Sequence, residues 1–191
     1  LFNAVDTDRY QPRARASGGS INVLFVGQDF ERKGLQQLID AFLHIEDHRL
    51  KLTIVGGDKR WHLPLKSITQ VGATSDTRPY YRAADFFVLP TRHDPCSLVV
   101  LEALAMGLPV ISTKFNGATE IMTDGVHGYV LDDPSAVPAL ADAMQKLMDP
   151  QRRAEMSKAC LELRPRLSYE HHLDRLEEIY RSVLKPKSLS P

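Results

Sequence analysis

The sequence predicts an α/β fold with a central parallel sheet. Short apolar runs of strand length alternate with amphipathic segments of helical period, which is the pattern of parallel strands joined by helices. The apolar runs are continuous rather than alternating, as in strands that are buried on both faces. With 191 residues and 43% hydrophobic side chains, the chain can bury one core of this kind. We therefore expect a Rossmann-like sandwich of three layers with a six-stranded parallel sheet.

The expected elements follow this alternation along the chain. The strands are predicted at Val23–Gly27, Leu50–Gly56, Ile68–Gly72, Phe86–Pro90, Pro109–Thr113 and Gly128–Leu131. Helical patterns between them cover Lys33–Ile45, Thr77–Ala84, Ser97–Met106 and Gly117–Met122, and three more follow at Ala136–Met148, Pro150–Leu163 and Ser168–Leu184. Residues 58–67 are only weakly helical, because Pro64 interrupts the segment. Residues 1–20 are predicted to be a connector, 21–167 the Rossmann-like domain and 168–191 a C-terminal helix.

Composition excludes several classes of partner. Lys and Arg balance Asp and Glu at 24 each, so no net charge favours nucleic acid or a bare anionic membrane. Cys96 and Cys160 have no metal-ligand spacing and suit a reduced compartment, so we expect a cytoplasmic protein without a metal. No signal peptide or membrane-spanning run of about 18 apolar residues is visible. Because the chain starts without Met, on residues that resemble a connector, we expect a piece of a larger protein.

Ligands of open parallel sheets bind beyond the carboxyl ends of the strands, which singles out loops 27–34, 56–60, 72–76 and 90–97. In the first of these loops, Gly27 permits close approach of backbone to a ligand. Lys33 is expected in the first turn of the following helix, where the helix dipole opposes its charge and an anion would favour it. The alternative is a solvated lysine. No G-x-G-x-x-G follows the strand, which argues against a nicotinamide-dependent oxidoreductase.

The last of these loops leads into a helix that contains one carboxylate. Glu102 is the only charged residue between Ser97 and Gly107, and a buried carboxylate needs hydrogen-bonding partners that nothing nearby in the sequence supplies. A polyhydroxyl ligand could supply them. Ser97 is the expected N-cap, so the free amides after it would face the same crevice. The alternatives are an exposed helical position for Glu102 and a turn-capping role for Asp94, next to which His93 is a further candidate ligand contact.

Five segments in this order resemble the C-terminal, donor-binding half of the retaining nucleotide-sugar glycosyltransferases of the GT-B fold, the group-1 family. The resemblance covers almost the whole chain. The segments are Asn3–Asp6 (N-G-V-D in the family), Val26–Gly34 (V-G-R-x4-K-G), Tyr81–Asp85 (Y-x-x-A-D), Asp94–Ala103 (E-P-F-G-x4-E-A) and the closing helix Ser168–Tyr180, which resembles the helix that crosses back to the N-terminal domain.

The resemblance implies roles for individual residues. Lys33 would hold the donor diphosphate, beside Gln28 at the position of the family's arginine. Glu102 would accept hydrogen bonds from the ribose hydroxyls, and Asp94 would face the hydroxyls of the donor sugar, so Lys33 and Asp94 are the implied catalytic pair. The remaining contacts would come from Gly27, from the amides of Cys96, Ser97 and Leu98 to sugar and phosphate, and from backbone at Gly72, Ala73 and Thr74 to the base.

Three departures from the family pattern bear on activity. Gln28 lacks the arginine's charge, which leaves neutralisation of the diphosphate to Lys33. Asp94 is one methylene shorter than the family's glutamate, and Asn116 replaces the first glycine of a Gly-Gly turn. The motif V-G-x-D-F-x-R-K-G most resembles the one in bacterial enzymes that glucosylate the lipopolysaccharide inner core.

The implied activity is retaining transfer of a sugar, from a nucleoside-diphosphate sugar and most simply a UDP-sugar, to an acceptor hydroxyl in cell-surface glycan or lipopolysaccharide synthesis. No cofactor or metal is implied. The expected partners are an N-terminal acceptor domain that this chain lacks and a glycan or glycolipid acceptor, with attachment to the inner face of the membrane through that domain. The chain alone would be inactive. A non-catalytic Rossmann-like module that binds a nucleotide or a partner protein stays open as the alternative.

Overall fold

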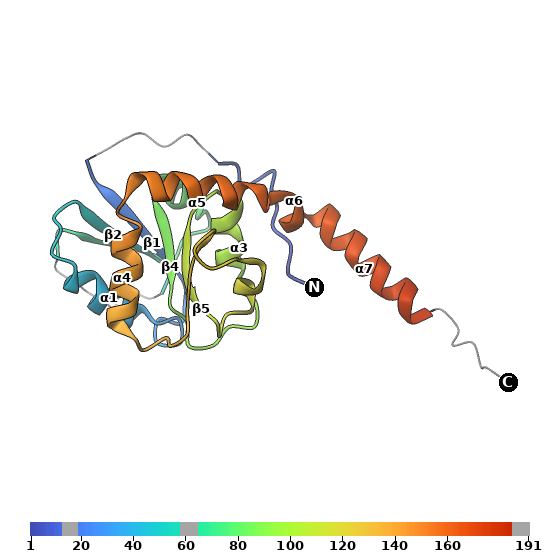
Figure 1. The fold of residues 1–191 in the computed structure, drawn as a ribbon, viewed down its shortest axis with the longest axis horizontal. Helices are drawn as coiled ribbons and strands as arrows, with labels where there is room; N and C mark the ends of the chain where they lie inside the picture. Colours follow the sequence, from blue (N-terminus) through green and yellow to red (C-terminus); the bar gives the residue numbers. More distant parts are fainter. Residues whose placement is uncertain (13–18, 58–64, 185–191) are drawn as a thin grey trace.

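The computed structural model describes residues 1–12, 19–57 and 65–184. Its centre is a six-stranded sheet in the order β3-β2-β1-β4-β5-β6, in which every neighbouring pair is parallel (Figure 1). The strands are β1 (Ile21–Val26), β2 (Leu50–Val55), β3 (Ile68–Gly72), β4 (Phe86–Leu89), β5 (Val110–Thr113) and β6 (Gly128–Leu131). The predicted fold class is therefore confirmed, and each strand lies within two residues of its expected bounds.

Helices cover both faces of this sheet. They are α1 (Leu35–His44), α2 (Arg78–Ala83), α3 (Leu98–Ala105), α4 (Val137–Lys146), α5 (Pro150–Glu162), α6 (Arg164–Leu167) and α7 (Tyr169–Leu184), with a 3-10 helix η1 at Gly117–Ile121. α1 packs beside α4, whereas α3 packs against α5 and α6, which gives the three layers seen in Figure 1. The helical pattern expected at 117–122 is the 3-10 helix η1. One expectation is corrected: residues 65–67 are not helical, and residues 66 and 67 form a turn. The rest of the weakly helical segment, 58–64, lies outside the described residues.

The core explains why the strands read as continuous apolar runs. Val23, Leu24 and Phe25 of β1 are completely buried, as are all four residues of β4. These two adjacent strands occupy the middle of the sheet and have helices on both sides, so side chains of either parity leave water. Burial of this apolar surface is the main stabilising contribution to the fold.

The predicted connector is fixed to the domain over residues 1–12. Val5 is buried, and its amide donates to the carbonyl of Leu167 at 2.8 Å. The Arg164 guanidinium, at the start of α6, donates to the carbonyls of Thr7 at 2.7 Å and Tyr10 at 2.8 Å, and also to the last turn of α3. The connector, α3 and α6 are thus joined through one side chain.

α7 extends away from the body of the domain (Figure 1), and none of its residues is buried. Its exposed apolar side chains recur at helical spacing, at Tyr169, Leu173, Tyr180, Val183 and Leu184. Across the described residues, every helix is too short or too polar to cross a membrane.

A glycine in the turn before α1 allows the loop after β1 and the loop after β4 to lie close together. Gly34, directly before α1, has φ of 76°, in the left-handed region that glycine tolerates. A Cβ at this position would lie 2.1 Å from the carbonyl oxygen of Pro90, at the end of β4. Only glycine allows the two loops to approach this closely.

We predict that Gly34→Ala lowers the free energy of unfolding by about 2 kcal/mol or more, because it adds both a left-handed alanine and a clash with backbone. Gly125→Ala is the matched control: φ is 74° there, but a Cβ would meet no atom within 4 Å, so only the conformational cost of about 1 kcal/mol applies. Urea denaturation measures both. Equal losses in the free energy of unfolding would show that the clash with Pro90 does not add to the cost of Gly34→Ala.

Candidate functional site

A cavity of about 490 Å³ opens at the carboxyl ends of β1, β2 and β4. This is the edge at which an open parallel sheet binds its ligands. Seven of the residues predicted from the sequence line it: Gly27, Gln28, Lys33, Asp94, Cys96, Ser97 and Leu98. The wall is completed by Asn3 of the connector, by Thr74 and Thr77 after β3, and by Arg32 and Val99.

Lys33 and Asp94 contact each other in this cavity. The Lys33 ammonium forms an ion pair with Asp94 Oδ2 and donates to Ser97 Oγ at 3.3 Å. Both side chains are nearly buried, at 12% and 10% exposed, so water screens this pair less than one on the surface. The expectation that Lys33 lies in the first helical turn is wrong, because α1 begins at Leu35 after Gly34.

Arg32 is a second cation at this site that sequence reasoning missed. Its Nη1 donates to the carbonyl of His93 at 2.9 Å and lies 3.7 Å from Asp94 Oδ2, while its Nε donates to Asp29 at 3.1 Å. Its position directly before Lys33 in the sequence could have indicated that it also lies at this site. Two cations therefore surround one carboxylate, and the charge at the cavity does not come from Lys33 alone.

Gln28 has a structural partner at the position where the family has arginine. Its Oε1 accepts from the amide of Gly57 at 3.3 Å, which ties the loop after β1 to the loop after β2. Gln28 thus contributes loop geometry and no charge. His93 is exposed, and among the described residues it contacts the site through its backbone carbonyl, which accepts from Arg32 and Thr91.

The amino end of α3 faces this cavity through Ser97, Leu98 and Val99. Ser97 is the N-cap residue as predicted, but its hydroxyl makes no capping bond and instead accepts from Lys33. The amides of Leu98 and Val99 have no acceptor among the described residues, as is usual for the first turn of a helix. These N–H groups, together with the dipole of α3, favour an anion.

Asn116 holds the loop that carries Asp94. It is completely buried, and its Oδ1 accepts from the amides of Ser97 at 3.2 Å and Ala118 at 3.1 Å. Its Nδ2 donates to Ser112 Oγ at 3.1 Å, and its backbone forms a parallel bridge with Asp94. The asparagine that replaces a family glycine is therefore a buried hub of hydrogen bonds.

Glu102 has a hydrogen-bonding partner within the chain, from a residue that is distant in the sequence. The Tyr81 hydroxyl, 21 residues earlier, donates to Glu102 Oε2 at 2.8 Å. Burial raises the pKa of Glu102, and the hydrogen bond from Tyr81 and the nearby Tyr10 hydroxyl partly offset this rise. Glu102 does not line the cavity as the described residues bound it; it lies beside the part of the wall formed by Thr77 and Val99.

The predicted base contacts are only partly brought to the site. Gly72 ends β3 with φ of 80°, and its carbonyl accepts from the amide of Gly56 at 2.8 Å. Neither Gly72 nor Ala73 lines the cavity among the described residues, whereas Thr74 does. No group of three potential metal ligands occurs in the described part of the chain.

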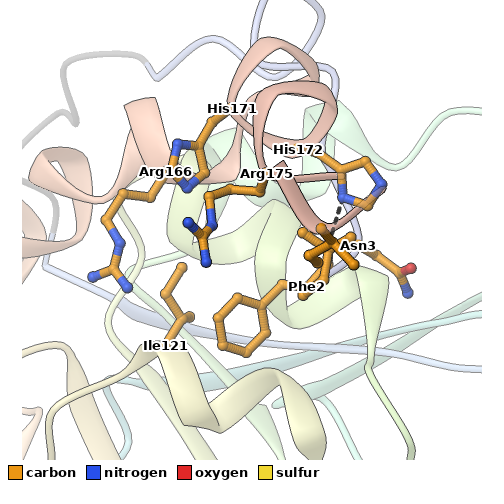
Figure 2. Close-up of a pocket in the computed structure, with 9 residues that line it drawn as sticks. Phe2, Asn3, Ile121, Arg166, His171, His172 and Arg175 are labelled. Carbon is orange, nitrogen blue, oxygen red and sulfur yellow. Dashed lines mark hydrogen bonds between the residues drawn. The ribbon is translucent and has the colours of Figure 1, made fainter. Parts of the chain in front are cut away.

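A smaller cavity of about 220 Å³ lies between the connector, η1 and α7 (Figure 2). His172 Nδ1 is 2.7 Å from the carbonyl oxygen of Phe2, and Arg175 is paired with Glu178. Asn3 lines both cavities, so the connector forms the partition between them. This second cavity lies where the connector packs against α7.

Comparison with known proteins decides the family. The model of the group 1 glycosyl transferases matches residues 20–150. The chain belongs to the group 1 glycosyl transferases. The lipopolysaccharide core biosynthesis glycosyltransferase LpsE of Rhizobium meliloti is 35% identical over 119 residues, which are 58% of this chain and 34% of LpsE. The D-inositol 3-phosphate glycosyltransferase of Arthrobacter is 31% identical over 179 residues, 81% of this chain and 42% of that protein.

The fold of this glycosyl transferase matches solved GT-B enzymes. Anabaena HepE in complex with UDP-glucose superposes with a TM-score of 0.80 over 95% of this chain and 57% of HepE, at 19% identity. The group 1 chain thus spans about half of its structural neighbour and less than half of the two curated relatives. Its sheet corresponds to the C-terminal half of the GT-B fold, as predicted.

We predict that Asn116→Ala destabilises this glycosyl transferase by about 1–3 kcal/mol, because it strips buried amides and the Ser112 hydroxyl of their partner. Asn3→Ala removes an exposed amide with one 3.5 Å contact and should change stability by less than about 0.5 kcal/mol. Thermal and urea unfolding compare the two. An Asn116→Ala protein as stable as the control would contradict the hub role.

Proposed function

We propose that this chain is the donor-binding half of a retaining glycosyltransferase that uses a nucleoside-diphosphate sugar, most simply a UDP-sugar. The observation that carries the proposal is the convergence of Lys33, Arg32 and the free amides at the start of α3 on one cavity. That convergence suits a diphosphate, which needs several positive groups at once. HepE, which shares this fold, binds UDP-glucose.

The proposed chemistry is electrostatic. Departure of the diphosphate leaves negative charge on its oxygens and positive charge on the sugar ring. Lys33 and Arg32, with the amides of α3, would stabilise the departing group through charges placed before the reaction begins. No metal or other cofactor takes part in the proposed step.

Asp94 would change partners when the donor binds. The diphosphate competes for Lys33, which releases one Asp94 oxygen toward the hydroxyls of the donor sugar. Asp94 is buried and its backbone is held by the bridge to Asn116, so its carboxylate can shift partners without moving its backbone. We assign Lys33 and Asp94 as the catalytic residues, and Glu102 as the ribose-binding residue.

The binding site for the acceptor would come from another domain of the complete protein. The exposed apolar stripe of α7 fits an N-terminal acceptor domain against which this helix packs, and LpsE suggests a lipopolysaccharide or related cell-surface glycan as product. We place the enzyme in the cytoplasm, with any membrane attachment made by the acceptor domain. The chain alone would bind donor but transfer nothing.

A thermal-shift screen against UDP, GDP, ADP and their glucose conjugates tests the function directly, since a ligand that binds the folded state raises the melting temperature by mass action. We expect one nucleoside diphosphate to stabilise the chain. The absence of any shift at millimolar ligand would overturn the proposal.

The second candidate function is a non-catalytic module that binds nucleotide. It is favoured by Gln28, whose side chain carries no charge and is engaged with Gly57. Activity assays on the complete protein distinguish the two functions. A binding module would bind the nucleotide but would neither hydrolyse a sugar nucleotide nor transfer its sugar.

We predict that Lys33→Ala slows sugar transfer by the complete enzyme by about 10²-fold or more, the usual effect of removing one preorganised group that stabilises developing charge. Lys158→Ala on the exposed side of α5 is the control and should leave the rate unchanged. Steady-state assays with the identified donor measure both. Full activity of Lys33→Ala would refute its assignment.

We predict that Glu102→Ala weakens nucleotide binding by about 1–3 kcal/mol, through loss of hydrogen bonds to a charged group. Calorimetric titration gives the affinity of each protein. The deoxyribose analogue dUDP supplies the control, since it lacks the 2′-hydroxyl and should be less sensitive to this substitution. Equal losses for UDP and dUDP would place Glu102 away from the 2′-hydroxyl, and no loss for either would refute the ribose role.

A further inference from the structure

Glu102 belongs to a partly buried cluster with two tyrosines that come from different parts of the chain. Tyr81 of α2 is buried, and its hydroxyl donates to Glu102 Oε2 at 2.8 Å and lies 3.1 Å from the carbonyl oxygen of Val99. A hydroxyl has one proton, and the carboxylate is the stronger acceptor, so the proton belongs on the Glu102 side.

Tyr10 brings the predicted connector into this cluster. Its ring packs edge-to-face on Tyr81, with centroids 5.9 Å apart and planes at 74°. Its hydroxyl is 3.4 Å from Thr77 Oγ1, and its proximity to Glu102 favours the charged form of that carboxyl. Arg164 holds the Tyr10 carbonyl and the last turn of α3, the helix that carries Glu102. The connector and Glu102 are therefore positioned together.

The geometry points to Tyr81 and Tyr10 as positioning residues that keep the Glu102 carboxylate ionised and oriented for the nucleotide. This inference rests on the proposed function for its ligand. A carboxylate accepts about four hydrogen bonds, and the two hydroxyls use at most two, so capacity remains for ribose hydroxyls. Thr77 and Val99, which contact the two tyrosines, line the donor cavity itself.

The charged groups around Glu102 explain why the tyrosines matter. The guanidinium of Arg9, in the connector, also favours the charged form of Glu102, but less than the tyrosine hydroxyls do. Burial opposes ionisation, so the hydroxyls are the main groups that favour the carboxylate form. Without them Glu102 takes up a proton at higher pH, and a protonated carboxyl accepts ribose hydroxyls poorly.

The test compares Tyr81→Phe and Tyr10→Phe with Tyr80→Phe, a neighbour in α2 whose hydroxyl has no hydrogen bond with the described residues. Calorimetry with UDP at pH 6 and pH 8.5 measures affinity, and a ¹³C-carboxyl NMR titration follows Glu102 without ligand. We expect Tyr81→Phe to bind UDP about 10-fold more weakly than the wild type at pH 6 but within about 2-fold at pH 8.5, from the usual strength of a hydrogen bond to a charged group. Tyr10→Phe should show a smaller effect in the same direction.

Each outcome is decisive. The UDP phosphates titrate equally in every variant, so the ratio to wild type reports the protein. A loss in Tyr81→Phe that is the same at both pH values would indicate a structural role and overturn the inference, as would an unchanged pKa of Glu102 in the NMR titration. If the wild type binds no UDP, the proposed function fails; a raised pKa of Glu102 in Tyr81→Phe but not Tyr80→Phe would still support its positioning by Tyr81.

Discussion

The close contact between the turn before α1 and the loop after β4 determines the geometry of the site. β1 and β4 are adjacent parallel strands, so the chain leaves both at the same edge of the sheet. Gly34 lies against the Pro90 carbonyl, and the amide of Arg92 donates to the carbonyl of Arg32 at 2.9 Å. This contact places Arg32 and Lys33 against Asp94. The positions of Arg32 and Lys33 thus depend on Gly34, which has no Cβ to clash with Pro90.

Buried hydrogen bonds then fix the remaining polar groups. Asn116 holds the start of α3 and the Asp94 loop, and Tyr81 holds Glu102. Within the described residues, no buried side-chain nitrogen or oxygen lacks a partner. Satisfied networks of this kind are rigid, because moving one group leaves another without its hydrogen bond. The site is accordingly preorganised for charge before any ligand enters.

The sequence predicted the fold and the location of the candidate cavity but few of its internal contacts. The period of apolar residues is a local signal, and it located the six strands; the rule that ligands bind at the carboxyl ends of strands located the loops. The Tyr81–Glu102 hydrogen bond joins residues from two helices, so no local pattern could reveal it. The predicted start of α1 at Lys33 was two residues too early. Gly34 has a left-handed conformation, so Lys33 belongs to the turn and the helix begins at Leu35.

The central claim is that the cations and the α3 amides form one diphosphate site. A ¹H–¹⁵N NMR titration of the chain with UDP tests this most directly, since it reports each amide separately. We expect saturable shifts at Gly27, Lys33, Leu98 and Val99, with Gly125, which precedes the amino end of β6 and does not line the cavity, unchanged. Shifts confined to other parts of the chain, or none at all at millimolar UDP, would contradict it.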